Sequence, residues 1–293
     1  MASAETSYPY VAIDVAEDEA DEAGARLFEL GARGVEVRDE TTLHRGVSGK
    51  VTLWAGFASE DEARAAIGEL RAAWRPRAEH VVGDAWRDEW KKHFEPFRIC
   101  PGIVVAPPWR QAPEGAGERV IVLEPGRAFG TGLHETTRLV ATILAERAAS
   151  VAAGPVLDVG CGSGILALVA LALGAPSARA VDVDPEAVGV TRENAKRNGV
   201  TDRLAADDDP VAAVPARYPT VVANIECAPL VAMAPDLAPR VAPGGLLILS
   251  GLLAEEVAPS QLPDIRRAYA EMTMESVRRD GEWIAVVLRA PAL

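Results

Sequence analysis

Val156-Leu-Asp-Val-Gly-Cys-Gly-Ser-Gly-Ile-Leu-Ala167 predicts a buried strand, a glycine-rich turn and the first turn of a helix. The apolar run continues to Leu173 and stops at Gly174, which is typical of a parallel strand that leads into a crossover helix. The glycines at positions 160, 162 and 164 allow backbone N–H groups to approach a ligand at a helix N-terminus. We therefore expect a ligand-binding loop in this stretch.

The spacing of the glycines bears on the kind of ligand. A dinucleotide fingerprint is Gly-x-Gly-x-x-Gly, and counting from Gly160 places Ile165 at the third glycine. A degenerate match starts at Gly162 and accepts Ala167, but Gly160 already ends the strand. Asp158 would repel a pyrophosphate and would attract an ammonium group. A cationic ligand is therefore favoured over a dinucleotide.

S-adenosyl-L-methionine is such a ligand, because it has a sulfonium, an amino group and a ribose diol but no phosphate. The predicted strand 178–184 ends in acids, and Asp182 lies 22 residues after Gly160, where an acceptor for ribose hydroxyls is expected. A dinucleotide would require the same acid, so Asp182 places the ribose without choosing between the ligands. The candidate cofactor contacts from this pattern are Asp158, Gly160, Gly162 and Asp182.

Length and charge limit the class of protein. The chain has 293 residues, which favours two domains. Its formal net charge of -13 argues against an extended nucleic-acid surface and would suit a basic protein substrate, although acidity also serves solubility. We expect no direct nucleic-acid partner.

Cysteines, histidines and apolar runs point to a reduced, soluble protein. The 3 cysteines are widely spaced, as in a cytosolic protein with free thiols, and the 4 histidines show no metal-ligand spacing. Residues 1–10 lack a signal-peptide pattern, and the apolar run 165–173 is too short to cross a bilayer. We therefore expect a cytoplasmic monomer with no metal and no membrane association.

Residues 1–80 predict a small α+β domain. Strands are expected at 10–15, 34–38, 51–57 and about 80–82, with helices at 17–30 and from Ser59 to about Trp74. Glu62 stands at the capping-box position after Ser59. This order is the ferredoxin-like split unit. Because no catalytic constellation occurs before residue 80, we expect a substrate-recognition module.

Residues 81–115 predict a linker, with a helix at 84–94 followed by a proline-rich segment that contains a short strand at 103–106. Trp86, Trp90 and Phe94 recur every four residues along this helix, which is more typical of packing than of ligand binding.

Residues 116–293 predict an α/β domain of alternating strands and helices that ends in an antiparallel hairpin, 272–278 with 283–288. The last two helices are expected at 229–241 and from 255 to about 269. A glycine-rich loop at 124–137 is expected either to close over a ligand or to cap the next helix, and Thr136 and Thr137 suit both roles. Asn224 ends the buried strand 219–225, at the edge where open α/β sheets bind ligands.

Several motifs together closely resemble the bacterial methyltransferase family of large-subunit ribosomal protein eleven. They are Ala128-Phe-Gly-Thr-Gly-Leu-His-Glu-Thr-Thr137, Asp158-Val-Gly-Cys-Gly-Ser-Gly-Ile-Leu-Ala167, Asp182-Val-Asp-Pro185, Asn194-Ala-Lys-Arg-Asn-Gly199 and Val222-Ala-Asn-Ile225. The resemblance is strong over about residues 84–288, and the first eighty residues agree in architecture. A minor departure is Leu133, where relatives often carry a polar residue.

The resemblance implies a Rossmann-like S-adenosylmethionine methyltransferase domain of seven strands, preceded by a domain that grips the ribosomal protein. It implies trimethylation of lysine side chains and of an N-terminal amine. By motif position, it places cofactor contacts on Thr137, Gly160, Asp182 and Asn224. It names no catalytic residue; Asn224 is a candidate acceptor from the incoming amine, and His134 and Glu226 are candidate proton acceptors.

Three other functions remain open from the sequence. A related methyltransferase acts on lysines of an electron-transfer flavoprotein and shares these motifs. The second is a methyltransferase of a small molecule. Small-molecule and nucleic-acid methyltransferases usually carry Asn/Asp-Pro-Pro-aromatic after the fourth strand, where this chain has Asn224-Ile-Glu-Cys-Ala-Pro229, and this difference weakens the second alternative. The third is a nucleotide-sensing module without catalysis, and intact Asp158, Gly160 and Asp182 argue against it.

Overall fold

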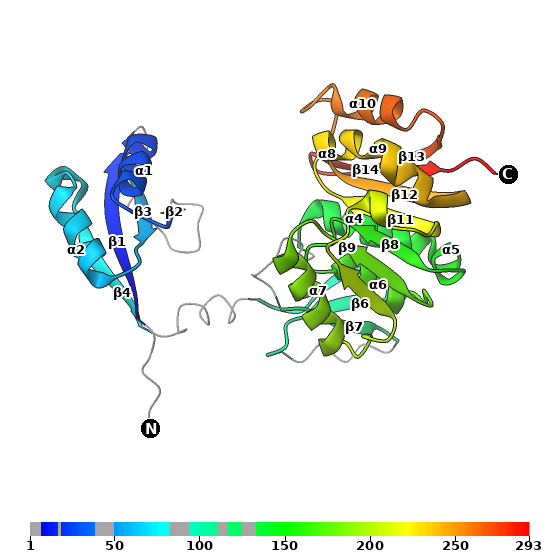
Figure 1. Ribbon diagram of the computed structural model, residues 1–293, viewed down its shortest axis with the longest axis horizontal. Helices are drawn as coiled ribbons and strands as arrows, with labels where there is room; N and C mark the ends of the chain where they lie inside the picture. Colours follow the sequence, from blue (N-terminus) through cyan, green and yellow to red (C-terminus); the bar gives the residue numbers. More distant parts are fainter. Residues whose placement is uncertain are drawn as a thin grey trace. The chain divides into compact units, whose positions relative to one another are not determined.

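The computed structural model describes residues 7–16, 19–38, 50–82, 94–110, 117–124 and 133–292. The chain forms two units, Met1–Phe94 and Glu95–Leu293 (Figure 1). The helix expected at 84–94 lies outside the described residues apart from its last position, and so does most of the glycine-rich loop at 124–137.

The first unit is a split β-α-β fold. Its antiparallel sheet has the strand order β2-β3-β1-β4. The elements are β1 Ser7–Ala16, α1 Ala20–Glu29, β2 Gly34–Arg38, β3 Lys50–Gly56, α2 Glu60–Glu69, a 3-10 turn Ala72–Trp74 and β4 Arg77–Val82. Ala23 and Leu27 of α1 and Ala63 and Ala66 of α2 are buried in a core with β1 and β3. This arrangement confirms the ferredoxin-like fold.

Capping sets the start of α2. The Ser59 hydroxyl accepts the Glu62 N–H at 3.3 Å, and the Glu62 carboxylate accepts the Ala58 N–H at 3.1 Å. In a capping box the Glu62 carboxylate would accept the N–H of the N-cap residue Ser59, but here it accepts the N–H of the preceding residue, Ala58. The helix ends at Glu69 instead of near Trp74, because Leu70 is extended at ψ 151 and a 3-10 turn follows.

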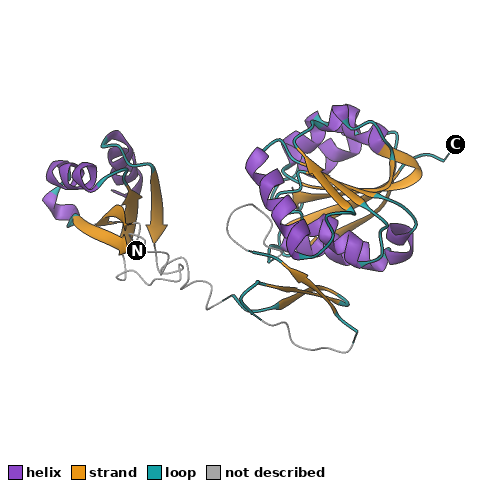
Figure 2. Ribbon diagram, turned by 60° about the horizontal axis from the view of Figure 1, so that its bottom comes forward, coloured by secondary structure: helices purple, strands orange, loops and turns teal. Residues whose placement is uncertain are grey.

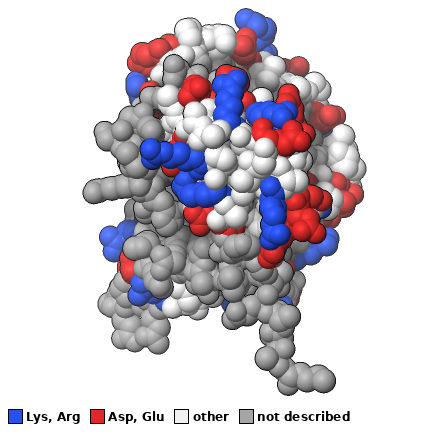
Figure 3. Space-filling model, turned by 90° about the vertical axis from the view of Figure 1, so that its left-hand side faces the viewer, with Lys and Arg blue, Asp and Glu red and all other residues white. Residues whose placement is uncertain are grey.

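Lysine and arginine side chains are interspersed with aspartate and glutamate on the face of this unit that Figure 3 shows. Arg26 of α1 pairs with Glu29 and Glu69, and Arg71 pairs with Glu22. Exposed pairs of this kind contribute little to stability. The described acids of α1 therefore have partners within the unit.

The second unit contains a small sheet in the order β5-β6-β7, built from β5 Phe97–Cys100, β6 Ile103–Ala106 and β7 Arg119–Val122. Strands β5 and β6 are antiparallel, and β6 and β7 are parallel. Part of the segment expected to be a linker is thus folded into this unit, because Ile103 and Val105 are buried in its main core.

The large sheet has seven strands in the order β10-β9-β8-β11-β12-β14-β13. The first five are parallel, and β14 is antiparallel to both β12 and β13. The strands are β8 Val156–Val159, β9 Ala178–Val181, β10 Leu204–Asp207, β11 Tyr218–Asn224, β12 Val241–Leu253, β13 Thr273–Asp280 and β14 Trp283–Arg289. The seven strands and the terminal antiparallel hairpin agree with the sequence prediction.

Helices cover both faces of the large sheet (Figure 2). One core contains residues of α4 Glu135–Glu146, α5 Ala148–Ala152, α6 Ile165–Ala172 and α7 Pro185–Arg197. The other contains residues of α8 Cys227–Ala232, α9 Ala234–Leu237 and α10 Gln261–Ala268. Neighbouring strand residues enter opposite cores, as Val156 and Leu157 do, because side chains alternate along a strand.

Prolines shorten two of the expected helices. The helix expected from Pro229 to Val241 is α8, α9 and a 3-10 turn at Ala238–Arg240, because Pro235 and Pro239 lack the N–H that a continuous helix requires. The helix expected from Glu255 begins only at Gln261, after Pro259.

Candidate cofactor site

Three glycines shape the loop between β8 and α6. Gly160, Gly162 and Gly164 have positive φ angles of 69°, 53° and 76°, which residues with a Cβ atom rarely adopt. A Cβ on Gly160 would lie 2.5 Å from Ile225 Cγ2, and one on Gly164 would lie 2.7 Å from Thr191 Cγ2. The loop thus needs glycine both for its backbone conformation and for its close packing.

Side chains of α7 hold the loop from behind. The Thr191 hydroxyl donates to the Gly162 carbonyl at 3.0 Å, and the Asn194 amide donates to the Ser163 carbonyl at 2.9 Å. Burial raises the pKa of Cys161 well above its ordinary value, so its thiol stays protonated. Cys161 is therefore a packing residue of the loop rather than a nucleophile.

Asp158 faces α6 rather than the ligand side of the loop. It is 1% exposed, and its carboxylate accepts the Ala167 N–H at 3.0 Å. Burial raises its pKa to about 7, opposed by the Ala167 bond and reinforced by the charge of Asp182. Asp158 is not among the residues that line the cavity described below, so it differs from the expectation that it meets an ammonium group directly.

Asp182 follows β9 and reaches the loop. Its carboxylate accepts the Gly162 N–H at 2.9 Å through one oxygen and the Asp184 N–H at 3.1 Å through the other. Asp184 in turn caps α7 by accepting the Glu186 N–H. The loop after β8 and the turn after β9 are therefore joined through one carboxylate.

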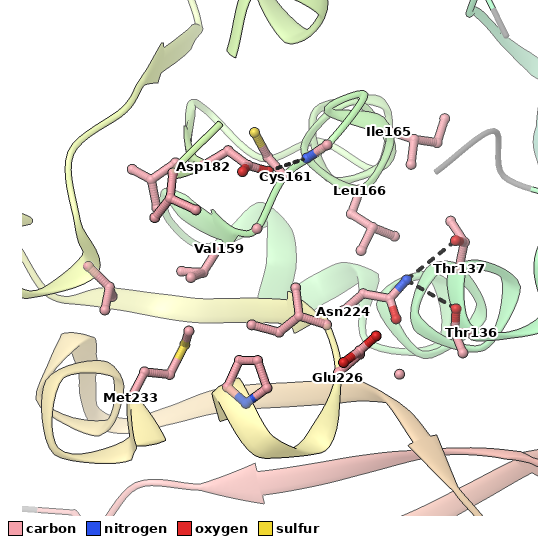
Figure 4. A pocket seen from close by; sticks show the side chains of 18 of the residues that line it. Thr136, Thr137, Val159, Cys161, Ile165, Leu166, Asp182, Asn224, Glu226 and Met233 are labelled. Carbon is pink, nitrogen blue, oxygen red and sulfur yellow. Dashed lines mark hydrogen bonds between the residues drawn. The ribbon is translucent and has the colours of Figure 1, made fainter. Parts of the chain in front are cut away.

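Asn224 ends β11 opposite the first turn of α4 (Figure 4). Its amide nitrogen lies 3.2 Å from the Thr136 hydroxyl and 3.4 Å from the Thr137 hydroxyl. Both threonines are buried. His134 precedes them, and its ring meets the Trp283 ring edge-on at 4.9 Å between centroids.

These groups surround a cavity of about 770 Å³ at the carboxyl ends of β8, β9 and β11 (Figure 4). Open α/β sheets bind ligands at this position. The sequence-predicted residues that line it are Thr137, Gly160, Gly162, Asp182 and Asn224, together with the candidate acceptors His134 and Glu226. The tertiary structure therefore brings all the predicted site residues except Asp158 to one cavity.

Other lining residues were not predicted. Trp283 and Gly251 come from β14 and β12, and Val211 and Met233 add apolar surface. Strand pairing brings Trp283 and Gly251 to the site, so no local pattern in the sequence signals their position. Asp209, which follows β10, also lines the cavity.

A second cavity of about 640 Å³ adjoins the first on the side of α8 and α10. The two share Glu226, Gly251 and Trp283. Its charged lining residues are Glu226 and Asp264, and no lysine or arginine is among the described residues that line it. Asp264 pairs at 3.0 Å with Arg267, which is largely exposed.

Two further features concern only the part of the chain that the structure describes. There, no group of three or more His, Cys, Asp or Glu side chains is arranged to hold a metal ion. No described helix is long and apolar enough to cross a membrane.

The large sheet, its antiparallel hairpin and the glycine loop beside Asp182 define a Rossmann-like methyltransferase fold. The crystal structure of the ribosomal protein L11 methylase from Lactobacillus delbrueckii subsp. bulgaricus is similar to this chain at a TM-score of 0.60 and 32% identity, covering 68% of this chain and 100% of that one. The family model described as "Ribosomal protein L11 methyltransferase (PrmA)" matches residues 7–291. The chain belongs to this family.

Two relatives align with nearly the full length of this chain. A ribosomal protein L11 methyltransferase from Sorangium cellulosum (strain So ce56) is 52% identical, covering 98% of this chain and 97% of that protein. Another, from Pelobacter propionicus (strain DSM 2379 / NBRC 103807 / OttBd1), is 36% identical, covering 98% of this chain and 99% of that protein. The family therefore includes the N-terminal unit as well as the methyltransferase sheet.

Proposed function

We propose that this chain methylates large-subunit ribosomal protein L11 in the cytoplasm, with S-adenosyl-L-methionine as the methyl donor. The proposed acceptors are lysine side chains and the N-terminal amine. The observation that carries the proposal is one cavity lined by the glycine loop after β8, Asp182 after β9 and Asn224 at the end of β11. Family membership supports the same substrate.

The donor groups of the cavity suit S-adenosylmethionine. The Asp182 carboxylate is the candidate acceptor for the two ribose hydroxyls, and Val211 and Met233 offer apolar surface for a purine. Gly160 and Gly162 line the cavity, and their backbone is the proposed contact for the methionine part. Thr137 and Asn224 complete the proposed contacts. The bound cofactor would supply an electrophilic methyl group on a sulfonium.

The chain must provide an uncharged amine in line with that methyl group. Deprotonating a lysine near pH 7 costs about 4 to 5 kcal/mol, against about 1 kcal/mol for an α-amine. Apolar walls disfavour the ammonium form. Asn224 is the proposed acceptor for an N–H of the amine, and His134 and Glu226 line the same cavity as candidate proton acceptors.

The adjoining cavity supports the approach of a cationic substrate from the side of α8 and α10. Its charged lining residues, Glu226 and Asp264, are both acidic, and it meets the first cavity at Trp283. A lysine that enters there would be attracted before it loses its proton. The N-terminal unit, Met1–Phe94, is the proposed site that grips the ribosomal protein.

Intact-mass spectrometry of recombinant L11 after incubation with this chain and S-adenosylmethionine tests the proposal. We expect mass gains in methyl steps with the unchanged chain and none with Asp182→Ala. Asp208→Ala is the matched control, because Asp208 is an exposed acid on the next strand end that does not line the cavity. No gain despite calorimetric cofactor binding would reassign the substrate, and no binding would refute the cofactor.

A further inference from the structure

A chain of hydrogen bonds runs from the N-terminus of α4 to the end of β11. The His134 Nδ1 atom lies 2.9 Å from the Thr136 hydroxyl, which lies 3.2 Å from the Asn224 amide nitrogen. Figure 4 shows that nitrogen turned toward both Thr136 and Thr137. Thr136 is 2% exposed, so the bonds it makes are shielded from water.

The direction of each bond follows from the helix N-terminus. The Thr136 backbone N–H donates to His134 Nδ1 at 3.4 Å, where His134 is the N-cap of α4. A ring nitrogen that accepts a hydrogen bond carries no proton, so the imidazole proton is on Nε2. The Glu135 carboxylate, at 4.0 Å from Nδ1, is beyond hydrogen-bond distance.

The single hydrogen of the Thr136 hydroxyl must therefore point to His134 Nδ1. Toward Asn224 the hydroxyl can then only accept, so it faces the NH₂ group of the amide. The Asn224 Oδ1 atom is directed away from Thr136. An amide in the opposite orientation would set two acceptors against each other, with no hydrogen between them.

We propose that Thr136 is a positioning residue that fixes the orientation of the Asn224 amide, so that Oδ1 is the acceptor offered to the substrate amine. This inference rests on the proposed function. An amine that directs its lone pair at the methyl group has only N–H donors left to offer. A reversed amide would present NH₂ hydrogens to those donors and would repel the amine in its reactive orientation.

Thr136→Val removes the hydroxyl at nearly constant shape, and Thr136→Ser retains it. Measured in the full chain with L11, we expect the valine variant to lower kcat roughly 10-fold to 100-fold and the serine variant to restore most of that loss. Thr142→Val is the matched control, because Thr142 lies further along α4 and does not line the cofactor cavity. Equal kcat for the valine and serine variants would overturn the proposal.

A second background separates positioning from simple structural damage. In Asn224→Asp both side-chain oxygens are acceptors, so a reversal of the side chain no longer matters. There, Thr136→Val should cause no further loss of kcat. An equal fold-loss in both backgrounds would overturn the positioning role. If Asn224→Asp is inactive, the valine and serine comparison decides, and an unchanged chain that methylates nothing would refute the proposed function instead.

Discussion

Asp158 is a fully buried carboxyl group at the end of β8, with a pKa raised to about 7 by burial. Its ordinary value is 3.8, so the folded chain holds this proton more tightly than the unfolded chain. The resulting stability is present below about pH 4 and is lost as the pH rises through about 7. At about 1.4 kcal/mol per pKa unit, the loss is about 4 kcal/mol.

Asp158→Asn should remove this pH dependence, because an amide of the same shape cannot ionise. Urea unfolding of both chains between pH 4 and pH 8 measures the effect. We expect the unfolding free energy of the original chain to fall relative to the variant as the pH rises. A constant difference between the two chains across this range would show that Asp158 ionises normally in the fold.

Gly160 combines a positive φ with a close neighbour, and Gly199 has a similar φ of 64 with nothing within 4 Å of a built Cβ. Gly160→Ala and Gly199→Ala therefore share a backbone cost of about 1 to 2 kcal/mol. Only Gly160→Ala adds the clash with Ile225, which borders the same cavity. We expect calorimetry to show weakened cofactor binding for Gly160→Ala alone; equal affinities would argue against a close approach of ligand to this loop.

At the level of secondary-structure elements, one side chain joins the small sheet to helix α7. Asn198, the C-cap of α7, accepts the Val122 N–H at 2.8 Å and donates to the Val122 carbonyl at 2.7 Å. Asn198 thereby satisfies both the N–H and the carbonyl of the last residue of β7. The motif Asn194-Ala-Lys-Arg-Asn-Gly199 thus ends in a residue that links two elements 76 positions apart.

Asn198→Ala should leave the Val122 N–H and carbonyl without these partners. We expect a loss of about 1 to 3 kcal/mol in the unfolding free energy, measured by urea denaturation. Lys196→Ala is the control, because Lys196 is exposed in the same turn and should change stability by less than about 0.5 kcal/mol. Similar losses for both variants would mean that the helix end, rather than the link to β7, sets the effect.

At the scale of the whole molecule, the two units have separate cores. The core of the first unit consists of residues from Val11 to Trp74, and the two cores of the second unit begin at Ile99 and at Leu157. A fragment Glu95–Leu293 therefore retains every described residue that lines the cofactor cavity. The two proposed tasks, gripping the ribosomal protein and transferring the methyl group, can be tested separately.

The fragment Glu95–Leu293 should bind S-adenosylmethionine within about threefold of the full chain, because every described residue that lines the cofactor cavity belongs to the fragment. Its kcat/KM for L11 should fall about 100-fold, since the N-terminal unit no longer raises the local substrate concentration. A short peptide with the N-terminal residues of L11 is the control and should be methylated equally by both chains. Full activity of the fragment on L11 would place recognition in the second unit.

Local patterns in the sequence were sufficient to predict most strands and helices and the positions of Gly160, Asp182 and Asn224, because periodicity and turn chemistry act over a few residues. Strand β5 in the proline-rich segment was not predicted. Helix lengths were predicted less well where prolines intervene, as after Met233 and before Gln261. The contacts of these residues with the cofactor stay a prediction.

The sequence by itself determined the order of strands and helices, the glycine loop and the acid that follows the next strand. Only the tertiary structure decided that Asp158 packs under α6, that Trp283 reaches the cavity from β14 and that Thr136 bonds to Asn224 across 88 positions. The physical reason is that these contacts depend on strand pairing and on crossover connections. Residues distant in sequence meet only when the whole sheet has formed.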